Sequence, residues 1–183
     1  MLTGLLEFRW RPVRWLIEGY LLLLTGTPLL VQIFLIYYGP AQFDWVKASW
    51  MWDLLRQPWF CAVLALGLNT AAYSTRLFKG ALDAVPYGEV LACKALGMTK
   101  GQTLNIKLRH AMRRVVPGYS NEVIMMLHST SLASAVPALL DITGAARQIY
   151  ADFYIPFEAF ITAGAIYATL TLMLVGLFKL AER

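Results

Sequence analysis

Four long apolar stretches, each free of charged residues, alternate with shorter charged segments along this chain. They cover residues 19–38, 57–75, 123–140 and 159–178, and none of them contains Asp, Glu, Lys or Arg. Each is roughly 18–20 residues long, enough for an α-helix to cross the hydrocarbon core of a bilayer. The pattern therefore predicts an all-α protein with four transmembrane helices. A soluble bundle of four buried helices is the alternative interpretation.

Charged and turn-forming residues set the boundaries of these elements. We place the spans at 15–39, 57–76, 121–140 and 157–179, with a long charged loop at 77–119. Residues 1–14 form a short apolar remnant and a connection, and the whole chain, 1–183, is one domain. Composition agrees with a membrane protein, because 58% of the 183 residues are hydrophobic, against about 45–50% in soluble domains. The mean hydropathy is +0.56.

Basic residues are distributed unevenly between the two sides that this topology defines. Thirteen Lys and Arg residues lie on the side of the termini and the long loop, against Lys47, Arg56 and Arg147 on the other. Because cytoplasmic segments are enriched in basic residues, the termini and the loop are predicted to be cytoplasmic. The net charge of +5 then reflects topology and not nucleic-acid binding. Cys61 and Cys93 fall on opposite sides, so no disulfide is expected, and no metal-binding spacing is present.

The first two spans contain residues that do not suit a plain membrane helix. Gly26 and Pro28 are close enough to break or kink the first helix, because proline lacks a backbone donor. This is either an ordinary kink or irregular backbone that lines a cavity. In the second span, Asn69, Thr70 and Tyr73 either hydrogen-bond to a neighbouring helix or line a pathway. Both interpretations stay open.

The third span is the most polar of the four. Glu122 and His128 lie in it together with the hydroxyls of Ser129, Thr130 and Ser131. A carboxylate at the end of a span can simply sit at the membrane interface. A carboxylate, an imidazole and three hydroxyls so close together favour a water-exposed pathway. The last span is almost uniformly apolar, and we interpret it as scaffold.

The long loop has the pattern of two short helices joined by a glycine turn. The first, over residues 92–98, is expected to stop at Gly97, and Thr99 followed by Gln102 predicts a capping box that opens the second. The second helix carries one apolar stripe, Leu104, Leu108, Ala111 and Val115. Residues 117–118, Pro-Gly, are expected to end it. The loop is either a membrane-surface helix, a solvated basic face, or a docking surface for a cytoplasmic partner.

Sequence signatures of enzymes are absent. The chain has no Gly-x-x-x-x-Gly-Lys-Ser/Thr phosphate-binding loop and no Gly-x-Ser-x-Gly nucleophile elbow. We therefore expect no catalytic residues, no metal and no cofactor. A membrane enzyme that uses Glu122, His128 and Ser131 is a minor alternative, because their spacing alone does not make a triad.

Residues 26–39 have the sequence GTPLLVQIFLIYYG, which resembles the signature of polar amino-acid ABC importer permeases. Residues 69–73 (NTAAY), 95–98 (ALGM), 120–122 (SNE) and 129–133 (STSLA) resemble the later motifs of that family, in its order. The similarity runs from about Arg14 to the C-terminus. Residues 25–43 and the loop around Cys93 are most similar to the M-type permeases of bacterial arginine importers.

The resemblance implies a type I ABC importer permease fold in the bacterial inner membrane. Expected partners are a cytoplasmic ATPase dimer that hydrolyses the ATP, a second permease subunit in a heterodimer, a periplasmic amino-acid-binding protein and the lipid bilayer. The substrate is expected to be a polar or basic L-amino acid, arginine first. A truncated, non-functional fragment of such a permease is the alternative.

The resemblance also implies roles for individual residues. Substrate-pathway positions are Asn69, Thr70, Glu122, His128, Ser131 and Leu132. Thr27, Pro28 and Gln32 belong to the structural motif of the pathway. Contacts with the ATPase fall on Leu91, Ala92, Cys93, Ala95, Leu96, Gly97 and Met98.

This chain departs from the family pattern in two ways. Residues 91–93 are Leu-Ala-Cys where the family usually has Glu-Ala-Ala, Arg109 replaces a usual Pro, and Arg76 and His128 replace a usual Glu and Lys. We expect altered docking contacts and a substrate site that is degenerate if the partner permease keeps the binding residues. Family members also carry one more N-terminal span, so we interpret residues 1–8 as its end. A truncated gene model or fragment is preferred over a four-span form.

Overall fold

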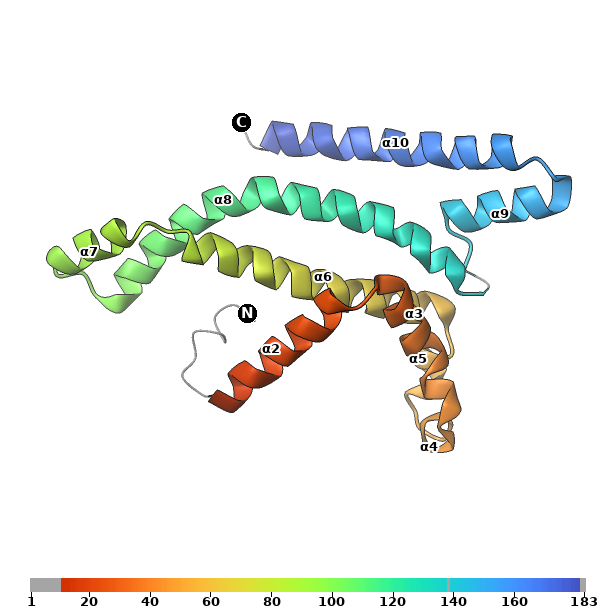
Figure 1. The fold of residues 1–183 in the computed structure, drawn as a ribbon, viewed down its shortest axis with the longest axis horizontal. Coiled ribbons are helices and arrows are strands. Elements are labelled where there is room, and N and C mark those ends of the chain that lie inside the picture. The colour runs from red at the N-terminus through yellow and green to blue at the C-terminus, as the bar shows by residue number, and fades with distance from the viewer. Residues whose placement is uncertain (1–10, 138, 182–183) are drawn as a thin grey trace.

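The computed structural model describes residues 11–137 and 139–181 (Figure 1). All regular elements in these residues are helical, as predicted. In chain order they are α2 (Arg11–Gly26), α3 (Leu29–Tyr38), the 3-10 turn η1 (Pro40–Gln42), α4 (Asp44–Lys47), α5 (Trp52–Leu55), α6 (Pro58–Asp83), α7 (Tyr87–Ala95), α8 (Lys100–Ser129), the 3-10 segment η2 (Thr130–Ala135), α9 (Ile142–Phe153) and α10 (Pro156–Ala181). The interpretation of residues 1–8 concerns positions outside these ranges.

Two long helices, α6 and α8, form the centre of the molecule. They pack along each other, with α2 and α3 against α6 and with α10 against α8 (Figure 1). The short helix α7 lies at one end of this pair, and α9 and the α3–α5 segment lie toward the other. Small apolar contacts hold the pair together, since Ala111 and Val115 of α8 are buried against Ala81, Leu77 and Phe78 of α6.

Within the described residues, one helix is long and apolar enough to cross a membrane by length and composition, Pro156–Leu180. The pair Pro12–Gly26 and Leu29–Gln42 passes the same test if it is counted as one broken span. Only 6% of the apolar window in Pro156–Leu180 is buried inside the protein. A helix that is apolar and uncovered on nearly every side is suited to lipid.

The predicted break at Gly26 and Pro28 is confirmed, and it is larger than a kink. Helix α2 ends at Gly26, α3 begins at Leu29, and their axes differ by 107°. The predicted first span, 15–39, is therefore two helices that run in different directions. Pro28 is extended, with φ −62° and ψ 134°, a conformation that cannot continue an α-helix.

The glycine turn of the long loop is also confirmed. Gly97 has a left-handed φ of +69°, and the backbone N–H groups of Gly97 and Met98 donate to the carbonyls of Lys94 and Cys93, both at 3.0 Å. This is the Schellman pattern that ends helices at a glycine. Thr99 and Gln102 then form the predicted capping box of α8. The helix before the turn begins earlier than expected, at Tyr87, directly after Pro86.

The expected end of the second loop helix at Pro117 and Gly118 is wrong. Helix α8 runs without interruption from Lys100 to Ser129, so the second loop helix and the start of the predicted third span are one element. Gly118 has a different role, because a Cβ atom there would lie 2.7 Å from Cδ1 of Leu77. The glycine lets α8 approach α6 closely, and this packing holds the helix together across the proline.

The remaining boundaries also differ from the predicted spans. Helix α6 continues past residue 76 to Asp83, and the third span loses its α-helical form after Ser129 and tightens into η2. The external connection folds into α9, which Asp141 caps by accepting a hydrogen bond from the Gly144 N–H at 2.8 Å. The last helix, predicted to be featureless, makes polar contacts, since the Tyr167 hydroxyl donates to Asp141 at 3.3 Å.

Candidate functional site

A cavity of about 250 Å³ lies where the break between α2 and α3 meets α6 and α8. Its lining comes from three parts of the chain that are far apart in sequence: Thr27, Pro28, Leu29, Leu66, Asn69, Thr70, Tyr73, Glu122, Met125, Met126 and Ser129. The volume is at the lower end of small-molecule sites, and the wall combines apolar side chains with a few polar groups. Three predicted substrate-pathway positions, Asn69, Thr70 and Glu122, therefore share one cavity with Thr27 and Pro28 of the predicted structural motif.

The missing N–H of Pro28 explains how the first wall of the cavity is built. In a continuous helix that N–H would bond to the carbonyl of Leu24, four residues earlier. Two side-chain amides replace it: Nε2 of Gln32 lies 2.8 Å from the Leu24 oxygen, and Nδ2 of Asn69 lies 3.0 Å from it. The Thr27 hydroxyl likewise donates to the Leu23 carbonyl at 2.6 Å. Polar side chains thus complete the broken end of α2.

Gln32 is the centre of this network, although it does not line the cavity. Its side chain is buried, with 4% of the residue surface exposed, and Nε2 also lies 2.8 Å from the Thr27 hydroxyl. The Asn69 amide donates to Oε1 of Gln32 at 3.1 Å. Because buried polar groups must be paired, Gln32 and Asn69 hold α3 and α6 in register around the break. The structural role of Gln32 stays a prediction, and these hydrogen bonds indicate what that role would be: to hold the break between α2 and α3 against α6.

The second wall comes from one face of α6. Leu66, Thr70 and Tyr73 recur at helical spacing on this face. The Thr70 hydroxyl lies 3.1 Å from the sulfur of Met126 on α8, and the Tyr20 hydroxyl donates to the Leu68 carbonyl at 2.7 Å to tie α2 to the same helix. Asn69 and Thr70 therefore bond to neighbouring helices and also line the cavity, while their role in a pathway stays a prediction.

The third wall carries the one acidic side chain of the cavity lining, Glu122. The residue is half-buried. The ion pairs among the described residues do not include it, and no Lys, Arg or His belongs to the lining. A carboxylate with restricted access to water and no cationic partner favours binding of a positive charge. The cavity is therefore chemically suited to the cationic end of a small ligand.

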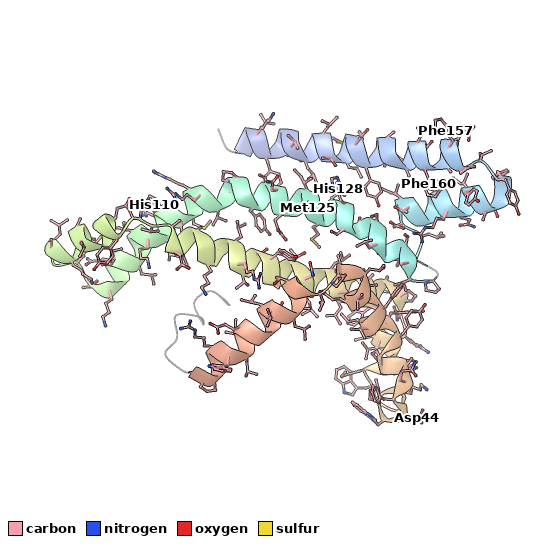
Figure 2. All side chains as sticks on the ribbon, viewed as in Figure 1. Asp44, His110, Met125, His128, Phe157 and Phe160 are labelled. Atoms are coloured by element: carbon pink, nitrogen blue, oxygen red, sulfur yellow. The ribbon has the colours of Figure 1, made fainter. Side chains whose placement is uncertain are left out.

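Three predicted pathway residues lie outside this cavity. The His128 ring faces away from α6, and its Nε2 lies 3.0 Å from Oγ1 of Thr171 on α10 (Figure 2). Ser131 and Leu132 belong to η2, where the hydroxyl of Ser131 donates to the backbone carbonyl of His128 at 2.7 Å. This hydroxyl therefore does not bond to the imidazole, and Glu122 lies elsewhere. The arrangement provides no support for a nucleophile and base built from these residues.

Sequence reasoning did not single out Leu66, Met125 or Met126, which line the cavity. Spacing from Glu122 could have found the two methionines, because residues three and four positions further along a helix share its face. The same rule places His128, six positions on, on a different face.

The predicted ATPase contacts lie on α7 and its C-terminal turn. Leu91, Ala92, Ala95 and Leu96 are exposed, and Leu96 keeps 79% of its surface accessible. Cys93 is buried instead, so it faces the protein and is not available for docking. Helix α7 lies at the end of the molecule opposite α9 (Figure 1), so these exposed side chains are at that end.

Comparison with known proteins is decisive at this point. Over residues 1–183 the chain matches the family of binding-protein-dependent transport system inner membrane components. The chain belongs to this permease family. It is 48% identical over 170 residues to the arginine ABC transporter permease protein ArtM of Haemophilus influenzae, covering 93% of this chain and 74% of that protein. It is 47% identical to ArtM of Escherichia coli K12, covering 92% and 76%.

Two further similarities extend this result. The permease is 46% identical over 174 residues to the nopaline transport system permease protein NocM of Agrobacterium fabrum, covering 94% of this chain and 72% of that protein. Its fold matches a crystal structure described as an amino acid ABC transporter with histidines, with a TM-score of 0.87 and 29% sequence identity. That match covers all of this chain and 81% of the other. The predicted family and its all-α permease fold are therefore confirmed, and the protein is an inner-membrane transport component.

Proposed function

We propose that this permease moves a cationic L-amino acid across the bacterial inner membrane, and that arginine is its substrate. The permeases to which it is similar carry names that refer to arginine and nopaline. The structural feature that carries the proposal is Glu122, the acidic group of a cavity whose described lining contains no cation. A guanidinium is planar and permanently charged, and its fork of donors suits a carboxylate.

The other polar groups of the cavity fit the second end of such a substrate. The Thr70 hydroxyl and the phenol of Tyr73 line the cavity on the α6 side, while Glu122 lines it on the α8 side. An amino acid has a carboxylate that accepts hydrogen bonds from hydroxyl groups and an ammonium that donates. We assign Thr70 and Tyr73 to the substrate backbone and Glu122 to the cationic side chain. His128, Ser131 and Leu132 have no place in this proposed site.

The proposed importer contains more than this chain. ATP hydrolysis takes place in a separate ATPase dimer that docks on the exposed residues of α7, a second permease completes the pathway, and a periplasmic protein delivers the amino acid. The chain crosses the membrane several times, with α7 on the cytoplasmic side and α9 on the other. The uneven distribution of basic residues along the sequence supports this orientation.

Substrate charge is the property to test. We would reconstitute the complete complex in proteoliposomes and measure ATP-dependent uptake of arginine and of citrulline, its uncharged isostere. Glu122→Gln should lower arginine uptake about tenfold or more, because a hydrogen bond to a charged group contributes about 1.5–3 kcal/mol and 1.4 kcal/mol is a factor of ten. Citrulline uptake should change much less. Glu122→Asp should keep part of the preference for arginine.

The matched control is Glu158→Gln, at the start of α10, where the carboxylate is exposed and does not line this cavity. It should leave both rates close to the wild-type values. If Glu122→Gln lowers arginine and citrulline uptake by the same factor, the carboxylate does not distinguish a charged from an uncharged substrate, and the assignment is wrong. If the wild-type complex transports neither compound, the proposed substrate class is wrong.

A further inference from the structure

A polar contact joins α7 to the first half of α8. Nδ1 of His110 lies 3.2 Å from Oε1 of Glu89, which belongs to the first turn of α7. The two side chains keep 28% and 41% of their surface exposed, so the contact is partly shielded from water. Nδ1 can donate to the carboxylate from the neutral ring or from the imidazolium. Figure 2 shows His110 on α8, at the end of the molecule where α7 lies.

Irregular backbone lies at both ends of α7, on either side of this contact. Pro86 precedes the helix in an extended conformation, and the left-handed Gly97 follows it. A helix of nine residues held only by such turns can pivot, because a short helix has little stability of its own. Arg114 of α8 secures the entrance, since its guanidinium donates to the Ala84 carbonyl at 3.4 Å. Glu89 and His110, together with the buried Cys93, hold the helix itself against the protein.

The uninterrupted course of α8 links this contact to the cavity. His110 and Glu122 lie on the same helix, and twelve residues at 1.5 Å each separate them by about 18 Å. Met126 and Ser129 of the cavity lining lie further along the same element. A packed helix moves as a unit, so a displacement of α7 that reaches His110 also reaches the third wall of the cavity. If α7 were free to pivot, it would rotate about the turn at Gly97, and the displacement would not reach α8.

We propose that the Glu89–His110 contact is a positioning pair that fixes α7 to α8 and makes the two helices move together. The pair touches neither substrate nor nucleotide. It transmits force from the docked ATPase to the wall that carries Glu122. This inference rests on the proposed function, because it needs α7 to be the docking helix. The inference adds Glu89 and His110 as the residues that connect the docking helix α7 to the cavity.

The test is a double-mutant cycle on the complete transport complex, with the number of ATP molecules hydrolysed per arginine transported as the readout. Glu89→Ala and His110→Ala should each raise this ratio about threefold or more, since ATP is hydrolysed while α7 pivots. The double alanine variant should be no worse than either single variant, because the second change removes a contact that is already lost. Simple loss of fold would instead lower hydrolysis and transport together.

Restoration of the contact with different chemistry provides the second arm. In Glu89→Gln/His110→Gln, two amides can form a hydrogen bond without either original charge, and the ratio should return to within about twofold of wild type. Arg113→Ala, at an exposed cation further along α8, is the control and should leave the ratio unchanged. Additive effects of the two alanine changes, no recovery in the double glutamine variant, or an equal effect of Arg113→Ala would each overturn the inference.

The design separates this inference from the proposed function. Association of the ATPase is measured for every variant by co-purification in detergent. If the wild-type complex forms and imports arginine but Glu89→Ala leaves the ratio unchanged, the positioning pair is wrong and the proposed function stands. If the wild-type chain does not bind the ATPase at all, the proposed function fails first.

Discussion

Two prolines lie inside segments with helical patterns in this permease, and the backbone responds to them in opposite ways. At Pro28 the helix breaks, and α2 and α3 differ in direction by 107°. At Pro117 helix α8 continues to Ser129. Both prolines have a glycine within two residues, so local composition does not explain the difference. The difference is explained by the surroundings of the backbone carbonyl that each proline leaves without its usual donor.

The break at Pro28 is stabilised by side chains from two helices. The Leu24 carbonyl accepts from Gln32 and Asn69, and the Leu23 carbonyl accepts from Thr27. In a buried site an unpaired carbonyl is costly, so these amides allow the end of α2 to exist away from water. The space opened by the break becomes part of the cavity.

At Pro117 the proline leaves the Arg113 carbonyl without its usual donor, but both residues are exposed. Water can satisfy an exposed carbonyl, so no amide network is needed there. Packing of Ala111, Val115 and Gly118 against α6 keeps both halves of the helix in line. A proline therefore breaks a helix where polar partners are placed to accept the break, and it is tolerated where packing holds the axis.

Loss of the Gln32 amide should have the greatest effect on stability at the break. Gln32→Met keeps the volume but removes the donor to Leu24 and Thr27 and the acceptor for Asn69. We expect a loss of about 1–3 kcal/mol, measured as a lower midpoint of thermal unfolding in detergent. Asn69→Leu should be less destabilising, because Gln32 remains on the Leu24 carbonyl. Thr169→Val is the control, since its exposed hydroxyl bonds only to the Ala165 carbonyl of its own helix; an equal effect there would contradict this account.

The close approach of α8 to α6 at Gly118 should be what keeps α8 helical across Pro117. Gly118→Val places a branched side chain against Leu77 and should destabilise the protein by about 1–3 kcal/mol through overpacking. Gly118→Ala should be milder, because the methyl of Leu77 can rotate away. Gly176→Val, at a helix position with nothing within 4 Å of the new Cβ, is the control.

A compensating change tests whether the clash is the cause. Gly118→Val combined with Leu77→Ala should recover part of the lost unfolding midpoint. No recovery would mean that Gly118 matters for another reason, such as backbone freedom next to Pro117.

The glycine turn after α7 is a third site of irregular backbone, and it depends on φ instead of on a missing donor. No atoms lie within 4 Å of a Cβ placed on Gly97, so any effect of substitution comes from the φ of +69°. Gly97→Val should cost about 1–2 kcal/mol and reduce co-purification of the ATPase. Gly97→Asn should retain most of it, because asparagine tolerates the left-handed region. Equal losses for the two variants would point to side-chain clashes with the ATPase.

Replacement of each proline by alanine should change the free energy of unfolding by a small amount, in opposite directions at the two sites. Pro117→Ala supplies the missing donor to Arg113 and should stabilise the protein by about 0.5–1.5 kcal/mol, the net contribution of one hydrogen bond. Pro28→Ala adds an N–H whose usual acceptor is already occupied and frees the unfolded chain, so it should destabilise by about 0.4–1 kcal/mol. Thermal unfolding of the two variants side by side measures this directly. Shifts of the same sign would mean that the two sites do not differ as described.

Most of the fold followed from local signals in the chain. Uncharged apolar stretches predicted the helices, Gly26 and Pro28 predicted the break, and Gly97, Thr99 and Gln102 predicted the turn and the cap that follows it. Each of these signals acts within a few residues, through a missing donor, a left-handed φ or a cap. The end of α8 was wrong because the local signal at Pro117 is opposed by packing against α6, which is distant in sequence.

The candidate site was predicted in part for the same reason. Asn69, Thr70 and Glu122 are polar residues in apolar surroundings, which any reading of the chain detects. His128, Ser131 and Leu132 are equally conspicuous in sequence, yet they lie outside the cavity. Helix α8 continues through Pro117, and its course decides which of its faces meets α6. That contact also decides that Met126 lines the cavity.

The amino-acid sequence was sufficient for the family, the all-helical architecture and the positions where the backbone had to become irregular, since these depend on residue types and short spacings. Tertiary packing was required to convert the irregular backbone into a cavity, to place Gln32 and Asn69 on one carbonyl, and to bring His110 to Glu89. The Asn69–Leu24 and Glu89–His110 contacts join residues that are 45 and 21 positions apart. No local preference specifies them, because they depend on the directions of whole helices.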